Sequence, residues 1–256
     1  MHHKNEYIAV FDSGVGGISV LKELVQLMPD EHYLYFGDSR NAPYGNRTTE
    51  QVRMLTMDAA QQLLERGTKA LVVACNTATA AAINELRQAH PETIIIGIEP
   101  ALKLAADRYP NGRVGIMATQ VTLREEKLHH QLERFPEMQV RLIPAPGLVE
   151  LIEQGKAGAP ETAALLESIL APYIGQLDAL VLGCTHYPFV KKAISQILGD
   201  GTALLDGGAG TARQTRRCLE QAGLLREGAG SITFENSSHD ASVLTLCANL
   251  LREDSV

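Results

Sequence analysis

Tryptophan is absent from this chain of 256 residues, and aromatic residues of all kinds make up only 5% of it. Proteins that bind single-stranded nucleic acid or glycans present aromatic side chains as stacking platforms, so this scarcity argues against both classes. No hydrophobic run approaches the ~20 residues of a membrane-spanning helix. The first residues, Met1-His2-His3-Lys4, lack the apolar core of a secretory signal. We therefore expect a cytoplasmic protein with no membrane partner.

A disulfide framework and a basic surface are also lacking. The four cysteines are too few and too widely spaced to staple a chain of this length, so reduced thiols are expected. The formal net charge is -7. The nearest thing to a basic cluster is Arg213, Arg216 and Arg217, whose helical spacing is typical of a solvated helix face. The sequence therefore predicts no nucleic-acid partner.

The composition that remains is that of an ordinary globular protein, with 45% hydrophobic and 21% charged residues, in a chain long enough for one large domain or two moderate ones. Short apolar runs alternate with stretches of helical periodicity along the whole sequence. The predicted strands are residues 7–11, 33–36, 70–74, 94–98, 113–117, 138–143, 179–182, 203–205 and 231–234. The predicted helices are residues 18–28, 49–66, 77–90, 121–135, 148–154, 161–174, 189–198 and 209–222, with a last one from about residue 240. This alternation predicts an α/β fold of mainly parallel sheets flanked by helices.

Two short segments suggest that the chain consists of two similar halves. Ala74-Cys75-Asn76-Thr77 and Gly183-Cys184-Thr185-His186 each follow an apolar run of the same shape, and their cysteines are 109 positions apart. Residues 8–13 also align with residues 114–119 at nearly the same offset, which favours an internal duplication. Each half then carries a thiol at the carboxyl end of a strand, where open α/β sheets bind their ligands. Two facing halves would bring both thiols to one cleft.

A glycine-rich turn, Asp12-Ser13-Gly14-Val15-Gly16-Gly17, follows the first predicted strand. The adjacent Gly16 and Gly17 break the spacing of a dinucleotide fingerprint, and Asp12 would face the pyrophosphate, so no nucleotide is predicted. One interpretation is a simple tight turn. The other is a helix amino terminus that receives a ligand carboxylate. In that case Asp12 would bind an ammonium group or orient a catalytic residue, and Ser13 would bind the carboxylate.

The two cysteines have both structural and chemical interpretations. A lone buried cysteine is commonly a core residue, and we interpret Cys218 and Cys247 in that way. Cys75 precedes a predicted helix, whose amino terminus stabilises a thiolate and lowers the cysteine pKa. His186 lies two residues after Cys184, but a zinc site needs three or four ligands and no second close pair exists, so no metal is predicted. A proton-sharing partner for the thiol is the better role for His186.

Four motifs together resemble the cofactor-independent glutamate racemases of the aspartate/glutamate racemase superfamily. They are Phe11-Asp12-Ser13-Gly14-Val15-Gly16-Gly17, Gly37-Asp38-Ser39-Arg40-Asn41-Ala42-Pro43-Tyr44-Gly45, Ala74-Cys75-Asn76-Thr77-Ala78-Thr79 and Gly183-Cys184-Thr185-His186-Tyr187-Pro188. The similarity covers nearly the whole chain in one order. It implies two pseudo-symmetric α/β domains with the active site in the cleft between them. The expected boundaries are residues 1–98 plus 208–256 for the first domain and residues 99–207 for the second.

The resemblance also implies roles for individual residues. Cys75 and Cys184 would be the two acid/base thiols, with Cys75 as the base from D- to L-glutamate and Cys184 as the base in reverse. Asp12 and His186 would assist the thiols, and Glu153 would act as an acid behind them. The residues expected to contact substrate are Asp12, Ser13, Tyr44, Gly45, Asn76, Thr77, Thr119, Thr185 and His186.

The expected activity is interconversion of L- and D-glutamate by removal of the α-proton on one face and delivery of a proton to the other. The resemblance implies no cofactor, hence no pyridoxal phosphate, metal or nucleotide. It implies a role in supplying D-glutamate for peptidoglycan, and a possible homodimer. The sequence departs from the family pattern at Glu150, where proline is usual, at Arg124-Glu125-Glu126-Lys127 and at Gly207-Gly208. None of these departures removes an expected catalytic group.

Three alternatives stay open at this point. The first is a racemase of another acidic amino acid, chiefly aspartate. The second is a protein that binds an acidic amino acid without chemistry, which the two matched cysteines argue against. The third is a cysteine hydrolase, since the spacing of Cys184 and His186 does not exclude one.

Overall fold

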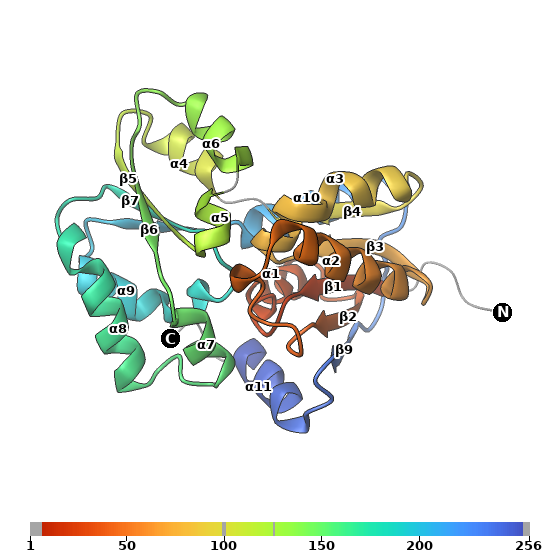
Figure 1. Cartoon of the computed structure of the whole chain (residues 1–256). Coiled ribbons are helices and arrows are strands. Elements are labelled where there is room, and N and C mark those ends of the chain that lie inside the picture. Colours follow the sequence, from red (N-terminus) through yellow and green to blue (C-terminus); the bar gives the residue numbers. More distant parts are fainter. Residues whose placement is uncertain (1–6, 99–100, 125, 253–256) are drawn as a thin grey trace.

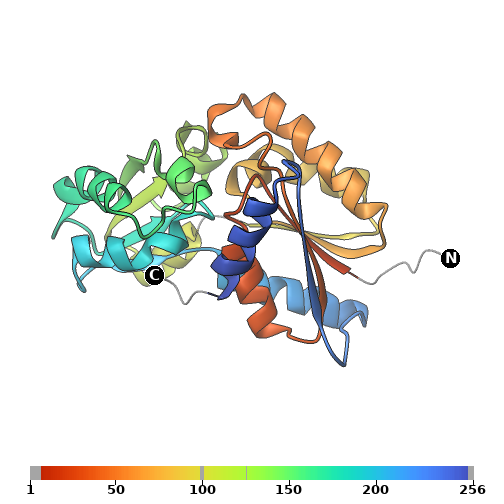
Figure 2. The same cartoon turned by 90° about the horizontal axis from the view of Figure 1, so that it is seen from below.

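The computed structural model describes residues 7–98, 101–124 and 126–252, which form two parallel sheets side by side with helices around each (Figures 1 and 2). The first sheet has the strand order β4-β3-β1-β2-β9. Its strands are β1 (Tyr7–Asp12), β2 (His32–Gly37), β3 (Thr68–Val73), β4 (Ile94–Gly97) and β9 (Ser231–Asn236). The second sheet has the order β6-β5-β7-β8. Its strands are β5 (Arg113–Ala118), β6 (Gln139–Pro144), β7 (Ala179–Leu182) and β8 (Ala203–Leu205).

The two sheets share one topology. If the first four strands of each half are numbered along the chain, both sheets have the spatial order fourth, third, first, second, and every described pairing is parallel. In both halves the strand that precedes the cysteine therefore lies next to the first strand of that half. The predicted α/β class with mainly parallel sheets is confirmed, and the shared order is what a duplicated chain would produce.

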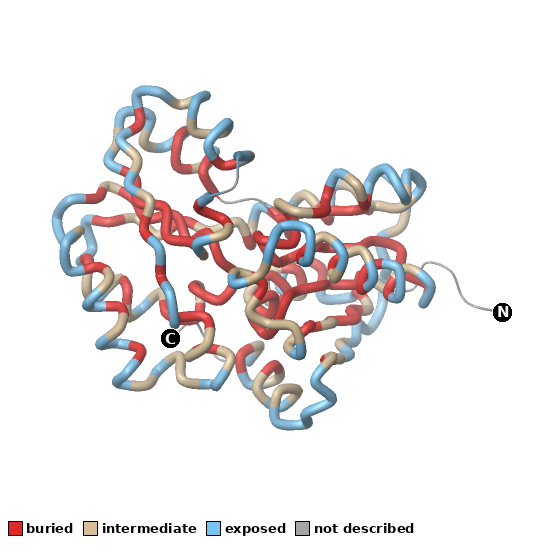
Figure 3. Tube along the Cα trace, viewed as in Figure 1, coloured by how far each residue is buried: buried red, intermediate tan, exposed pale blue. Residues whose placement is uncertain are grey.

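Helices cover both faces of the first sheet, which explains its nearly continuous apolar strands. In β1, Ile8 and Val10 pack in one buried cluster with α1 and α10, while Ala9 and Phe11 pack in another with α2 and α3. Figure 3 shows the buried strands surrounded by helices whose outer sides are exposed. The helices of this half are α1 (Ile18–Leu27), α2 (Thr49–Leu64), α3 (Asn76–Ala89), α10 (Gly208–Ala222) and α11 (Ala241–Arg252). Thr48 caps α2, since Thr48 and Gln51 form a capping box.

Most helices of the other half are shorter. They are α4 (Leu102–Arg108), α5 (Gln120–Arg124), α6 (Glu126–Glu133), α7 (Leu148–Glu153), α8 (Pro160–Leu170) and α9 (Lys191–Leu198). Three 3₁₀ turns complete the elements: η1 (Tyr44–Asn46), η2 (Ala171–Tyr173) and η3 (Tyr187–Val190). Of the helices in the described ranges, none has both the length and the hydrophobicity that crossing a membrane requires.

Two helix predictions need correction. The sequence analysis did not predict α4, although its residues Leu102, Ala105 and Ala106 are buried with the spacing of one helix face. The predicted helix 121–135 corresponds to α5 and α6, which lie on either side of residue 125, and residue 125 lies outside the described residues. The predicted helix from residue 189 begins as a 3₁₀ turn, because Pro188 occupies its first turn and the α-helix starts only at Lys191. The predicted domain boundary lies between residues 98 and 99. Residues 99 and 100 lie outside the residues that the structure describes.

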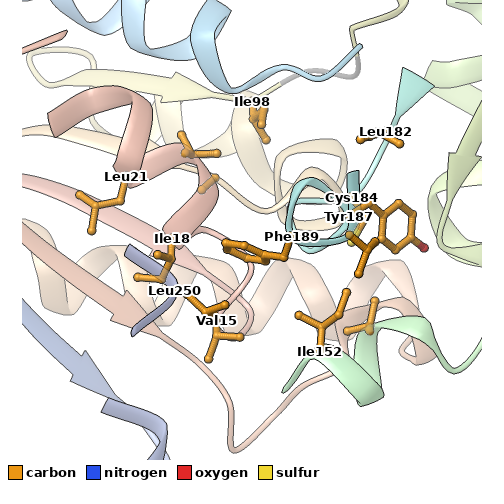
Figure 4. Packing of buried hydrophobic residues seen from close by; sticks show 14 of the residues in the cluster. Val15, Ile18, Leu21, Ile98, Ile152, Leu182, Cys184, Tyr187, Phe189 and Leu250 are labelled. Carbon is orange, nitrogen blue, oxygen red and sulfur yellow. The ribbon is translucent and has the colours of Figure 1, made fainter. Parts of the chain in front are cut away.

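One hydrophobic cluster joins the two halves. Val15 and Ile18 from the first half lie in the same buried cluster as Ile152, Tyr187 and Phe189 from the second (Figure 4). Because this apolar surface is shared, the carboxyl ends of the two sheets are held against each other by burial as well as by polar contacts.

A buried ion pair lies at the amino-terminal ends of the strands of the first sheet. The Lys69 ammonium lies 2.6 Å from the Glu31 carboxylate, and both side chains are almost completely buried. Lys69 also donates to the carbonyl of Leu224, and Glu31 accepts from the backbone N–H of Arg226. The pair therefore ties β3 to the segment that leads into β9.

We expect Glu31→Gln to lower the free energy of unfolding by about 3–5 kcal/mol, because it leaves the Lys69 ammonium buried without a countercharge. Urea unfolding followed by circular dichroism measures this loss. Glu235→Gln is the matched control, since it breaks a more exposed pair with Arg66 and should cost less than about 1 kcal/mol. Equal losses in the two variants would contradict a special role for the buried pair.

Candidate active site

Four strand ends of the two sheets surround one cavity. Asp12 ends β1 and Cys75 follows β3 in the first half, while Thr119 follows β5 and Cys184 follows β7 in the second. The residues that line the cavity are Ser13, Pro43, Tyr44, Gly45, Cys75, Asn76, Thr77, Thr119, Val149, Gly183, Cys184, Thr185 and His186. This set contains every predicted substrate-binding residue except Asp12. It adds Pro43, Val149 and Gly183, which the sequence analysis did not select.

Neutral groups dominate the lining. None of the described residues that face this cavity is lysine or arginine, and it holds hydroxyl, amide and thiol side chains together with His186. An anionic group that enters the cavity would therefore be bound by hydrogen bonds from hydroxyl groups and backbone amides. Three lining residues, Tyr44, Asn76 and His186, lie in or immediately before the first turn of an α-helix or 3₁₀ turn, where backbone N–H groups lack helical partners.

Cys75 is the residue immediately before α3, and its sulfur accepts a hydrogen bond from the Ala78 backbone N–H at 3.5 Å. The thiol also donates to the Ser13 hydroxyl oxygen at 3.4 Å. Burial, reinforced by the negative charge of Asp12, raises the pKa of Cys75 to about 12, and the hydrogen bonds only partly oppose this. The backbone N–H of Ala78 at the helix amino terminus lowers this pKa as predicted, but the expected net lowering is wrong because burial is the larger effect. Cys75 is a neutral thiol at neutral pH.

Cys184 has a different environment, because a histidine lies beside it. The Cys184 sulfur is 3.5 Å from Nδ1 of His186, and Nε2 of His186 is 2.5 Å from a Glu153 carboxylate oxygen. Burial alone would lower the pKa of His186, but its hydrogen bonds to Cys184 and Glu153 raise it well above 6.5. His186 is thus an imidazolium that can attract negative charge on the Cys184 sulfur.

Glu153 completes this chain of contacts from the far side of His186. Its carboxylate accepts from the backbone N–H of Val15 at 2.7 Å and from the Ser39 hydroxyl at 3.4 Å. Burial opposes ionisation, yet the hydrogen bonds from His186, Val15 and Ser39 lower the pKa of Glu153 below its usual value. Glu153 is therefore a carboxylate paired with the imidazolium.

The glycine-rich turn binds this carboxylate of the protein itself. Glu153 takes the N–H of Val15, so the prediction that the turn offers its amides to a ligand carboxylate is wrong at this amide. The glycines are required by close packing, because a Cβ added to Gly16 would lie 2.5 Å from the Thr185 hydroxyl and would overlap His186. The turn is thus a contact surface between the two halves.

Asp12 lies behind the cavity and is fully buried. Its two carboxylate oxygens accept from the Gly14 backbone N–H and from the Thr185 hydroxyl, each at 3.0 Å. Burial raises the pKa of Asp12, and the positive charge of His186 opposes that rise. Asp12 thus fixes Thr185 across the interface between the halves, whereas its contact with substrate stays a prediction.

The other predicted residues form a polar rim. The Tyr44 hydroxyl donates to Asp38 at 2.7 Å, and a Cβ on Gly45 would lie 2.8 Å from the Thr119 Cβ. Thr119 and Thr77 are joined through the buried Thr122, whose hydroxyl is 3.1 Å from the first and 3.3 Å from the second. Thr122 received no role in the sequence analysis. Asp38 and Ser39 stood inside a quoted motif but also received none.

The two other cysteines and Glu150 do not line this cavity. Cys247 is a buried core residue as predicted, whereas Cys218 is only half-buried and accepts a hydrogen bond from Gln214. Glu150, on α7, accepts from the Asn46 side chain of the other half at 3.4 Å. Across the described ranges, no three His, Cys, Asp or Glu side chains are grouped so that they could hold a metal ion.

Comparison with known proteins gives one consistent family. The model of the Asp/Glu/Hydantoin racemase family matches residues 8–215. The glutamate racemase of Clostridium kluyveri is 46% identical to this chain over 257 residues, which cover 99% of the chain and 100% of that protein. All four motifs quoted in the sequence analysis lie within residues 8–215, which the family model matches.

Solved structures agree with this similarity. The glutamate racemase of Thermus thermophilus in complex with β-chloro-D-alanine has a TM-score of 0.83 and 37% identity, over 97% of this chain and 94% of that one. The Escherichia coli glutamate racemase in complex with L-glutamate and the activator UDP-MurNAc-Ala has a TM-score of 0.87 and 33% identity, over 97% of this chain and 95% of that one.

Proposed function

Because this chain belongs to the Asp/Glu/Hydantoin racemase family, we propose that it is a glutamate racemase that inverts the α-carbon with two cysteine thiols. The observation that carries the proposal is the presence of Cys75 and Cys184, one from each half, in the lining of a single cavity. A stereocentre can be inverted by one group that removes a proton and a second that delivers one from the other side. The relatives named above are glutamate racemases, and one of them was solved with L-glutamate.

In the proposed reaction with L-glutamate, the Cys184 thiolate removes the α-proton and the neutral Cys75 thiol gives its proton to the opposite face. The products are D-glutamate, a Cys184 thiol and a Cys75 thiolate, so the number of protons is conserved. The imidazolium of His186 favours this starting state by stabilising the Cys184 thiolate, and burial favours it by keeping Cys75 protonated. The reverse reaction starts from the other arrangement, with a Cys75 thiolate and a Cys184 thiol.

The weak acidity of the α-C–H bond is the main barrier. Negative charge develops on the α-carbon and its carboxylate as the proton leaves, and fixed hydrogen-bond donors aimed at that carboxylate would stabilise it. Asn76 and Thr77 offer such donors, and the Asp12–Thr185 hydrogen bond fixes Thr185 in the cavity lining. The buried Asn76 amide oxygen has no hydrogen-bond partner among the described residues, so it is available to the substrate ammonium group.

The wider assignments follow from the family and are part of the same proposal. The residues that act on or bind glutamate are those predicted from the sequence, with Glu153 supporting His186. The reaction needs no pyridoxal phosphate, metal or nucleotide, and it supplies D-glutamate for peptidoglycan in the cytoplasm. The chain works as two domains, residues 1–98 plus 208–256 and residues 99–207, and it forms a homodimer.

The test is incubation of the purified protein with L-glutamate in deuterium oxide, without pyridoxal phosphate and after dialysis against a chelator. We expect D-glutamate that carries deuterium at the α-position, because the new α-proton comes from a thiol that exchanges with solvent. Chiral chromatography and mass spectrometry measure both features.

Three outcomes would overturn the proposal. Faster exchange with aspartate would identify an aspartate racemase. Glutamate binding without exchange would identify a binding protein, and a trapped acyl-thioester would identify a cysteine hydrolase.

A further inference from the structure

The last strand of the first sheet ends beside the segment that carries Tyr44. Strand β9 pairs in parallel with β2, and their final paired residues are Gly37 and Asn236 (Figure 1). Asn236 and Ser237 therefore reach the same sheet edge as Asp38 and Ser39, from which they are separated by almost two hundred residues of sequence. None of the chemistry assigned above uses Asn236 or Ser237.

Ser237 holds the start of the segment from Asp38 to Tyr44. Its hydroxyl donates to the Asp38 carboxylate at 2.6 Å and accepts from the Arg40 backbone N–H at 3.0 Å. The second carboxylate oxygen of Asp38 accepts from the Tyr44 hydroxyl at 2.7 Å. Tyr44 is itself buried and lines the cavity, so Ser237 is two hydrogen bonds away from a substrate-facing side chain.

Asn236 is connected through hydrogen bonds to the Glu153–His186 pair. It is 6% exposed, and its side-chain amide donates to the Ser39 hydroxyl at 2.9 Å. Ser39 in turn donates to Glu153 at 3.4 Å, on the carboxylate oxygen that His186 does not use. With the Asn236 donor in place, the Ser39 hydroxyl has its own proton left for Glu153. Loss of that donor frees the hydroxyl to rotate away.

We propose that Asn236 and Ser237 are positioning residues with separate tasks. Asn236 orients the Glu153–His186 pair that stabilises the Cys184 thiolate, and Ser237 orients Tyr44 toward the substrate. This inference rests on the proposed racemase function, and it assigns to the carboxyl end of β9 a share in both substrate binding and acid/base chemistry.

The two tasks have different kinetic signatures because the product of a racemase is the mirror image of its substrate. L- and D-glutamate have equal free energies in water, so kcat/KM must be the same in both directions for every variant. The complex with L-glutamate needs a Cys184 thiolate, whereas the complex with D-glutamate needs a Cys75 thiolate. A change that weakens support of Cys184 therefore raises KM for L-glutamate more than KM for D-glutamate. A change in the position of Tyr44 raises KM for L-glutamate and KM for D-glutamate by the same factor.

The experiment measures racemisation from each enantiomer for Asn236→Ala, Ser237→Ala and the control Ser238→Ala. Ser238 is exposed and contacts neither Asp38 nor Ser39 in the described structure, so its variant should keep wild-type kinetics. We expect Ser237→Ala to raise both KM values about 10-fold with their ratio unchanged, as for the loss of a hydrogen bond to a charged group. We expect Asn236→Ala to raise the ratio of KM for L-glutamate to KM for D-glutamate at least about threefold.

A folding check accompanies the kinetics. If Asn236→Ala unfolds below the assay temperature, Asn236→Asp takes its place, because the carboxylate still accepts from the Ser238 N–H but cannot donate to Ser39. An unchanged KM ratio in a folded Asn236 variant, or unchanged KM values in Ser237→Ala, would overturn the corresponding assignment. A wild-type protein that does not racemise glutamate in the same assay would overturn the proposed function itself, which separates the two failures.

Discussion

Serine in place of Cys75 or of Cys184 is expected to lower kcat/KM for glutamate racemisation by about 10³-fold, from either enantiomer. Positioned acid/base groups contribute about 10²–10⁴-fold, and a serine hydroxyl is too weak an acid to replace a thiol in either role. In both variants kcat/KM falls from either enantiomer, because each turnover uses one sulfur as base and the other as acid. Circular dichroism at a wavelength where glutamate absorbs follows the loss directly.

The chain offers an internal control for this experiment. Cys218→Ser changes a half-buried thiol on α10 whose recorded partner is Gln214, so it should racemise at the wild-type rate. Wild-type racemisation by either Cys75→Ser or Cys184→Ser would contradict the two-thiol mechanism. A variant that exchanges the α-proton of one enantiomer with solvent but forms no product would support it, since one base then still works alone.

Gly16→Ala is expected to reduce kcat/KM at least about 100-fold without touching a titratable group. The new methyl group would lie 2.5 Å from the Thr185 hydroxyl and would overlap the His186 ring, so both side chains must move away from Cys184 and Asp12. Misplacement of catalytic groups by about 1 Å costs about 10²-fold in rate. Steady-state kinetics with either enantiomer measures this loss, and thermal unfolding shows whether the variant keeps its fold.

Gly201→Ala is the matched control for this substitution. A Cβ at Gly201 meets nothing within 4 Å, so the variant should keep both activity and thermal stability. If Gly16→Ala instead racemises glutamate at the wild-type rate, the position of His186 does not matter and the support assigned to it here is wrong.

Most of the fold could be predicted because its central strands, β1, β3, β5 and β7, are buried on both faces. Continuous apolar runs mark such strands, and β7 and β8 begin and end at the predicted residues. Helix α4 escaped prediction because seven residues give too few turns for periodicity to stand out. The paired order of strands was not predicted from the sequence, since parallel neighbours are set by which helices cross which face.

The candidate site was predictable where its residues are adjacent in sequence and unpredictable where folding brings them together. The motifs pointed to Cys75 and Cys184. Whether the pKa of Cys75 is raised or lowered, however, depends on burial, which the sequence did not reveal. The contact of Glu153 with Val15 joins residues 138 positions apart, and that of Asn236 with Ser39 joins residues 197 apart. No local pattern marks such partners.

The contacts between the two halves have a consequence for how such a chain can evolve. Val15 with Glu153, and Asp12 with Thr185, are hydrogen-bonded pairs with one member in each half. A recombination event or an engineered chimera that exchanges one half for that of a relative keeps both thiols but can mismatch these pairs. Compatibility at residues 12–17 with residues 153 and 185 should therefore decide which chimeras are active.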